Sequence, residues 1–69
     1  MNIARAIRSY RLKQGLTQLD LAIKIDKSTR CIKRYEKGET IPSIKVLSEI
    51  FSISVDEVIA KGLIGKGII

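Results

Sequence analysis

The chain has 69 residues, of which 45% are hydrophobic, and a formal net charge of +6 at pH 7. This length suits one small domain, whose folding buries roughly 60% of the surface that the unfolded chain exposes, and the apolar content is too high for a disordered basic tail. The single cysteine, Cys31, excludes an internal disulfide, and the absence of histidine argues against a zinc site. We expect no metal and no cofactor.

A basic folded domain favours a polyanionic partner, such as DNA, RNA or an anionic membrane surface. No apolar run approaches the ~20 residues that a membrane span needs, and Arg5 and Arg8 interrupt the apolar residues near the N-terminus, which is unlike a signal peptide. We therefore expect a cytoplasmic protein without a membrane partner. Catalysis has no basis either, because the chain offers no histidine and no nucleophile beside a base, so we expect neither an enzyme nor a small-molecule ligand.

A first helix is predicted over residues 3–14. Asn2 can cap its start, and Gly15 can end it because glycine adopts a positive φ at no steric cost. Its apolar residues recur every three or four positions along one stripe, namely Ile3, Ala6, Ile7 and Tyr10.

A second helix is expected to run to about Ile25. The segment from Thr17 to Asp20 resembles a capping box that has aspartate in the usual place of glutamate. Asp26 and Lys27 form the predicted turn that follows.

A third helix is predicted over residues 29–37, with Ser28 as its N-cap and Gly38 at its end. At 100° per residue, five polar side chains share one arc of about 140°, and these are Thr29, Arg30, Lys33, Arg34 and Lys37. Cys31, Ile32 and Tyr35 fall on the opposite side. One face therefore suits the core and the other suits a partner.

Ser43 is expected to cap a fourth helix to about Phe51, and the sequence from Ser54 to Glu57 predicts a cleaner capping box before a short fifth helix that ends near Ala60. The fold class is thus all-α, with one five-helix domain over residues 1–60. Residues 61–69 form an apolar, glycine-rich tail, which could fold back on the core, join a dimer interface or remain disordered.

These features together resemble the Cro/repressor (XRE-type) helix-turn-helix family of phage repressors and bacterial regulators. The matching residues lie between about 5 and 59, and the most specific are Gly15-Leu16-Thr17-Gln18 and Tyr35-Glu36-x-Gly38-x-x-x-Pro42-Ser43. The resemblance implies a compact lambda-repressor-like DNA-binding domain. Two departures stand out: Asp26 replaces the usual glycine of the turn, and the stretch from Gly38 to Ile53 is a few residues shorter, so helix four should lack most of a turn.

The resemblance also implies roles for individual residues. Thr29, Arg30 and Arg34 match the base-reading positions, where arginine can pair with guanine and the threonine methyl can contact thymine. Arg11 and Glu36 match a structural ion pair that joins the first helix to the third. Contacts to backbone phosphates are expected at the start of helix two and around the third helix, from Thr17, Gln18, Lys27, Ser28, Lys33 and Lys37.

The expected function is that of a sequence-specific regulator of transcription, a Cro-like repressor that binds pseudo-palindromic operators in double-stranded DNA as a homodimer. The expected setting is the bacterial or phage nucleoid. Dimer contacts are assigned to the fifth helix and the tail, at Val55, Val58, Ile59, Leu63 and Ile64. The alternative is a protein-interaction module, such as an antitoxin or antagonist, with the same fold. An RNA-binding module is disfavoured because exposed aromatic residues for base stacking are scarce.

Overall fold

A computed structural model describes residues 2–60 of the chain. Five helices follow one another, namely α1 (Ile3–Lys13), α2 (Gln18–Lys24), α3 (Thr29–Lys37), α4 (Ile44–Phe51) and α5 (Val55–Ala60). Within this range there is no strand, and the predicted all-α class is confirmed. The proposed tail, with Leu63 and Ile64, lies outside the described residues.

The first four helices begin at the side-chain caps that the sequence predicts, because each cap accepts a hydrogen bond from an otherwise unpaired amide. The Arg5 amide donates to Asn2 Oδ1 at 3.0 Å, and the Asp20 amide donates to Thr17 Oγ1 at 3.0 Å. The Cys31 amide donates to Ser28 Oγ at 3.1 Å, and the Val46 amide donates to Ser43 Oγ at 3.2 Å. Local sequence therefore determines where these helices start.

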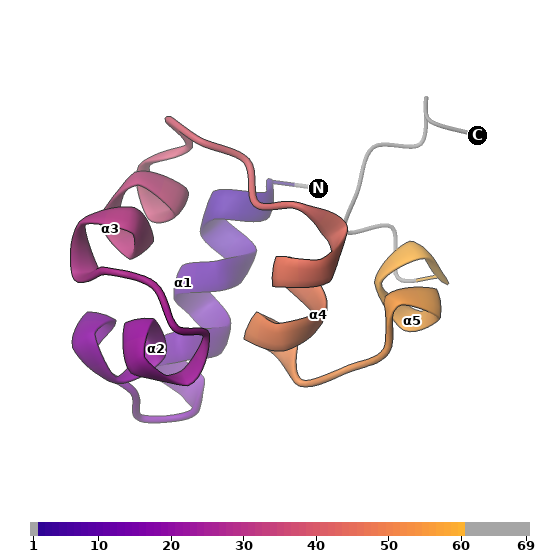
Figure 1. Cartoon of the computed structure of the whole chain (residues 1–69), viewed down its shortest axis with the longest axis horizontal. Coiled ribbons are helices and arrows are strands. Elements are labelled where there is room, and N and C mark those ends of the chain that lie inside the picture. The colour runs from indigo at the N-terminus through magenta and orange to yellow at the C-terminus, as the bar shows by residue number, and fades with distance from the viewer. Residues whose placement is uncertain (1, 61–69) are drawn as a thin grey trace.

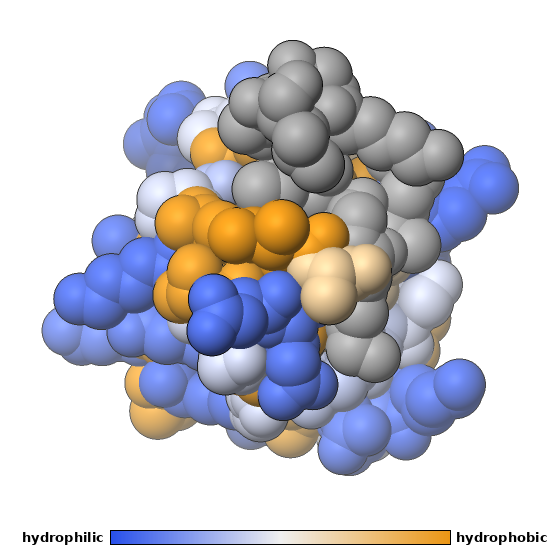
Figure 2. Space-filling model, turned by 90° about the vertical axis from the view of Figure 1, so that its right-hand side faces the viewer, coloured by the Kyte–Doolittle hydropathy of each residue, from blue (hydrophilic) through white to orange (hydrophobic). Residues whose placement is uncertain are grey.

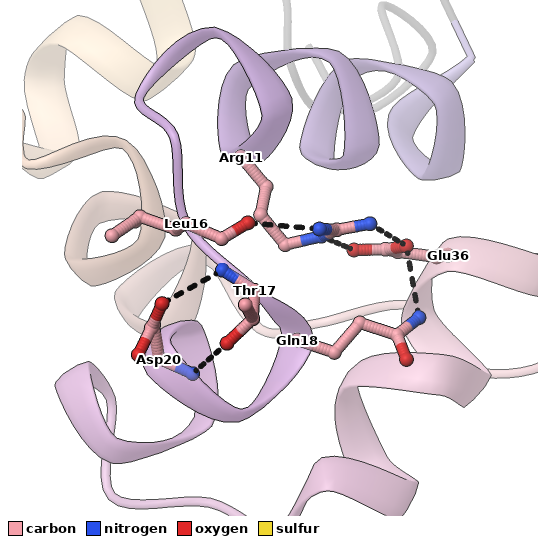
Figure 3. Close-up of polar contacts among 6 residues, drawn as sticks. All are labelled: Arg11, Leu16, Thr17, Gln18, Asp20 and Glu36. Carbon is pink, nitrogen blue, oxygen red and sulfur yellow. Dashed lines mark hydrogen bonds and ion pairs between the residues drawn. The ribbon is translucent and has the colours of Figure 1, made fainter.

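Of the two predicted capping boxes, the one at α2 is confirmed and the one at α5 is only half formed. At α2 the box is complete, since the Thr17 amide also donates to the Asp20 carboxylate at 2.8 Å (Figure 3). These bonds from Thr17 hold the pKa of the Asp20 carboxyl below its ordinary value. At α5 only the forward half is formed among the described residues: Ser54 Oγ accepts the Glu57 amide at 3.1 Å, while the Glu57 side chain stays exposed.

The turn between α2 and α3 keeps its left-handed residue although it lacks glycine. Asp26 has φ 55°, a conformation that aspartate tolerates better than most residues. The helix ends at Gly15 (φ 72°) and Gly38 (φ 79°) also use positive φ, as predicted. The departure at Asp26 therefore leaves the helix-turn-helix backbone intact.

In Figure 1, α2 and α3 lie to the left of α1 and α4 and α5 lie to its right. Both α1 and α2 pack against α3 and α4, and α5 packs against α4. Side chains from all five helices form one core, and its fully or nearly fully buried members are Ile7, Leu21, Ala22, Ile25, Ile32, Tyr35, Leu47, Ile50 and Val58. Although α4 has only eight residues, two of its side chains are completely buried. The shortened segment thus retains its place in the core.

A polar contact joins α2 to the end of α4. Lys24 Nζ donates to the Ile50 carbonyl at 3.1 Å and lies 5.5 Å from the centroid of the Tyr10 ring. The Tyr10 and Phe51 rings pack in a T-shaped arrangement, with centroids 5.1 Å apart. A lysine here binds one of the carbonyls that the end of α4 leaves unpaired and adds a cation–π contact.

The assignment of Val58 to a dimer interface is wrong. Its side chain is 0% exposed and packs in the core, because it faces inward on the single apolar stripe of α5. The other two assigned residues on this helix, Val55 and Ile59, are 40% and 44% exposed.

Candidate nucleic-acid interface

Helix α3 divides into a buried apolar face and an exposed basic face. Ile32 and Tyr35 are 0% and 6% exposed and anchor the helix in the core. On the other face Arg30, Lys33, Arg34 and Lys37 are exposed and Thr29 is half-buried. The helix is therefore held firmly on one side while its polar side chains remain available to a partner.

The residues assigned to phosphate contacts fall into two groups. Lys27, Ser28, Lys33 and Lys37 lie at the surface on or just before α3. At the start of α2, Thr17 is exposed but its amide and Oγ1 are already used by the capping box, and Gln18 is half-buried.

Arg11 and Glu36 form a bidentate ion pair between α1 and the C-terminal turn of α3 (Figure 3). Arg11 Nε and Nη2 donate to the two carboxylate oxygens at 2.6 and 3.1 Å, and Nη1 donates to the Leu16 carbonyl at 2.9 Å. The two side chains are only 10% and 6% exposed. Hydrogen bonding to Glu36 raises the pKa of the Arg11 guanidinium further above its ordinary value.

Gln18 joins this network, a contact that the sequence analysis missed. Its Nε2 donates to Glu36 Oε1 at 3.2 Å, and Figure 3 shows the amide pointing to the carboxylate beside the guanidinium. One amide hydrogen remains for a phosphate. No local pattern could reveal the contact, because it depends on the angle at which α2 meets α3.

Arg8 is a further residue that the sequence analysis left without a role. It lines a cavity of about 370 Å³ at the junction of α1, α2 and α3, together with Arg11, Gln18, Lys33, Glu36 and Lys37. Of these six residues, Gln18, Lys33 and Lys37 were assigned to phosphate contacts, and Arg11 and Glu36 form the ion pair. The structure thus gathers basic side chains from two helices around one cavity.

Tyr35 lies on the buried side of α3, opposite the exposed basic face. Burial raises the pKa of its hydroxyl to about 12, and the neighbouring Cys31 thiol adds to the shift. Tyr35 is a core residue, and the half-buried Cys31 packs beside the same core. Residues 2–60 contain no group of three or more histidine, cysteine, aspartate or glutamate side chains that could hold a metal ion.

A separate apolar surface lies on α5. Figure 2 views the molecule from the side on which α5 lies and shows hydrophobic residues next to hydrophilic ones. Val55 and Ile59 are the large apolar side chains that this helix exposes. Elsewhere α2 exposes Leu19 and Ile23, 57% and 70%, and the end of α1 exposes Leu12. None of the helices in the described part of the chain is long and apolar enough to cross a bilayer.

Comparisons with known proteins find relatives of this domain. Endothelial differentiation-related factor 1 of Homo sapiens is 40% identical over 50 residues, covering 72% of this chain and 34% of that protein. Multiprotein-bridging factor 1 of Debaryomyces hansenii is 38% identical over 50 residues, covering 72% and 33%. The Xenopus laevis homologue of the human factor is 35% identical over 68 residues, covering 99% and 43%.

The chain spans about a third of the length of the first two relatives. All three relatives are eukaryotic, so they lend no support to the bacterial or phage source that the sequence resemblance implied. No solved structure matches the chain significantly. A helix-turn-helix family model matches residues 7–53, which is more than half of the chain, and the chain therefore belongs to the XRE-type helix-turn-helix family.

Proposed function

We propose that the chain is a sequence-specific, double-stranded-DNA-binding regulator of transcription, without enzymatic activity. The observation that carries the proposal is the exposed basic face of α3, backed by the buried Ile32 and Tyr35. A helix of this kind fits the major groove, which is ≈ 12 Å wide. Arg30, Arg34 and Thr29 read base edges, and the flanking cations contact phosphates.

The finer proposal is a Cro-like repressor that binds as a homodimer. Two-fold pairing through α5 leaves α3 free for the groove, since the two helices lie on opposite sides of α1 (Figure 1). Two recognition helices would then enter successive major grooves, with half-sites ~34 Å apart on one face of the DNA. The operators are accordingly pseudo-palindromic.

The alternative function is a protein-interaction module, and a specific observation favours it. One of the relatives is named a multiprotein-bridging factor, and this chain exposes the large apolar residues Leu12 on α1 and Leu19 and Ile23 on α2. Exposed apolar side chains are a common feature of protein interaction sites. Under this reading the domain grips another protein, and its DNA binding is weak and unselective.

Selection from a random duplex library at about 150 mM salt, near physiological ionic strength, tests the proposal. Enrichment of a motif with two inverted half-sites supports both the regulator and its dimer, whereas enrichment of a single half-site supports DNA reading by a monomer. No enrichment, together with capture of a protein partner in the absence of DNA, favours the alternative. The Arg30→Ala/Arg34→Ala double variant should lose the motif, and Arg5→Ala, on the exposed face of α1, should retain it.

A further inference from the structure

Lys24 belongs to a cluster of polar and aromatic groups at the point where α4 ends. It lies in the last turn of α2, and its Nζ donates to the Ile50 carbonyl at 3.1 Å while lying 5.5 Å from the centroid of the Tyr10 ring. The Tyr10 ring packs in turn on the ring of Phe51, the last residue of α4, with centroids 5.1 Å apart. The cluster therefore joins α1, α2 and α4 at one place.

The Ile50 carbonyl takes its hydrogen bond from another helix, because the end of a helix leaves its last carbonyls without partners of its own. The backbone turns at Ser52, where φ is 56°, and the amides of Ser52 and Ile53 both pair with the Ser48 carbonyl. Within residues 2–60, the Ile50 carbonyl has no backbone donor. The ammonium of Lys24 thus completes the end of α4 and ties it to α2.

The connection from α4 to α5 is too short to absorb a shift at this end. Residues 52–54 alone separate Phe51 from Val55. The helix against which α5 packs is α4, and the completely buried Val58 holds α5 in the core. The two helices are therefore expected to move together, and the place where α4 ends relative to α2 sets the direction of α5.

We propose that Lys24 is a positioning residue that fixes the direction of α5 relative to the recognition helix α3, and through it the half-site spacing that a pair of chains accepts. This inference rests on the proposed homodimer through α5 and deepens it, because it names a residue outside both the groove-facing helix and the paired helix that determines which operators fit. Lys24 itself contacts neither the DNA nor the second chain.

A small change in the direction of α5 is enough to change the spacing. Half-sites ~34 Å apart place each recognition helix ~17 Å from the two-fold axis. A rotation of α5 by about 10° then moves α3 by about 3 Å, which is close to the ~3.4 Å rise of one base pair. A charge-assisted hydrogen bond and a cation–π contact to the same ammonium restrain this rotation from two helices at once.

Three variants separate the role of the ammonium from those of charge and packing. Lys24→Met keeps an unbranched side chain against Tyr10 but removes the donor, whereas Lys24→Arg keeps both the charge and the donors. Lys13→Met is the matched control, since Lys13 is also an exposed lysine in the last turn of a helix. All three changes are at exposed positions, and far-UV circular dichroism checks that each variant is folded.

In the first arm, residual dipolar couplings of the backbone amides are measured by NMR on the full chain. The couplings of α1, α2 and α3 define one orientation, and those of α5 should fit it in the native chain, in Lys24→Arg and in Lys13→Met. In Lys24→Met the couplings of α5 should deviate from it. An equally good fit of α5 in Lys24→Met overturns the proposal.

In the second arm, fluorescence anisotropy compares duplexes whose inverted half-sites have the selected spacing or one base pair more or less. The preference of the native chain for one spacing should fall about fivefold in Lys24→Met, which corresponds to the ~1 kcal/mol net contribution of one hydrogen bond. It should be retained in Lys24→Arg and Lys13→Met. Affinity for an isolated half-site should be equal in the two methionine variants, because both lose one charge. An equal spacing preference in these two variants overturns the role of Lys24 in spacing.

The two arms also separate this proposal from the proposed dimer. A changed direction of α5 in Lys24→Met, in a chain whose native form prefers no spacing, would overturn the dimer and leave Lys24 as the residue that positions α5. A spacing preference of the native chain that Lys24→Met retains in full would overturn this proposal and leave the dimer.

Discussion

Arg11 forms three side-chain hydrogen bonds that link separate parts of the fold. Its guanidinium bonds to Glu36 and to the Leu16 carbonyl, and so it connects α1, the entry to α2 and the end of α3. Arg11→Ala should reduce the free energy of unfolding by about 3 kcal/mol, since removal of one partner leaves the other charge poorly compensated in a nearly buried site. Urea denaturation followed by circular dichroism measures the loss.

The Arg11→Met/Glu36→Leu double variant is the control for this prediction. Replacement of a buried ion pair by apolar side chains of similar volume is often close to neutral, so the double variant should recover most of the lost stability. A loss below about 1 kcal/mol in Arg11→Ala would instead class the pair with exposed salt bridges.

Tyr35 should make the fold sensitive to alkaline pH. Its pKa is about 12 in the folded chain and ≈ 10 in an unfolded one, so the fold favours the neutral phenol. The associated stability is fully present below pH ≈ 10 and is lost as the pH rises towards 12. Two pKa units correspond to about 3 kcal/mol.

The variant Tyr35→Phe isolates this effect from every other contribution to the pH dependence. Urea denaturation at several pH values between about 9 and 12 should show a smaller loss of stability in the variant than in the native chain. Parallel curves for the two proteins would contradict the assignment of the pH dependence to Tyr35.

At the scale of the element, two arginines of α3 should contribute both affinity and sequence preference to DNA binding. Arg30→Ala and Arg34→Ala should each cost ~1–3 kcal/mol of binding free energy and relax the preference at one base pair. Competition binding against single-base variants of the selected site measures both quantities. An equal loss of affinity for every sequence would assign these arginines to phosphates.

The helices themselves could largely be predicted from sequence because their signals are local. Caps such as Thr17 and Ser28 act within one turn, and glycine or aspartate at positive φ ends a helix by its own backbone preference. The exposed basic side and the buried apolar side of α3 likewise follow from its period of 3.6 residues.

Apart from the Arg11–Glu36 pair, which the family resemblance implied, the contacts between helices could not be predicted from the sequence. Gln18 meets Glu36, and Lys24 meets the Ile50 carbonyl, only after α2 has packed at a particular angle. Val58 was assigned to a dimer interface, because the sequence does not tell whether an apolar side chain of the fifth helix faces the core or a second copy. Arg8 was overlooked for the same reason, because the cavity that it lines exists only between packed helices.

At the scale of the whole molecule, the two sides of α1 have different chemistry. The α2–α3 side carries the cation-lined cavity and the basic face, and α4 and α5 lie on the other side with the apolar Val55 and Ile59 (Figure 1). This separation allows a nucleic acid and a second chain to bind without competing for the same surface.

The apolar surface of α5 is small for the proposed dimer. A standard protein interface buries ≈ 800 Å² on each partner and involves ≈ 20–30 residues, whereas the large apolar side chains that α5 exposes are Val55 and Ile59, each by less than half. Weak pairing through this helix is therefore expected in free solution. On an operator, two half-sites hold the chains close together, and effective concentrations of mM order favour the pair.

Comparison of a full palindromic site with an isolated half-site tests this expectation. The native chain should bind the full site cooperatively, while analytical ultracentrifugation of the free protein should show mostly monomer at micromolar concentration. Ile59→Asp should abolish the cooperativity and leave half-site affinity unchanged apart from a charge effect. Ile23→Asp adds the same charge on α2 and should retain cooperativity, because Ile23 lies away from α5. Equal affinity per half-site in the native chain would show that the two copies do not interact, and the chain would then bind DNA as a monomer.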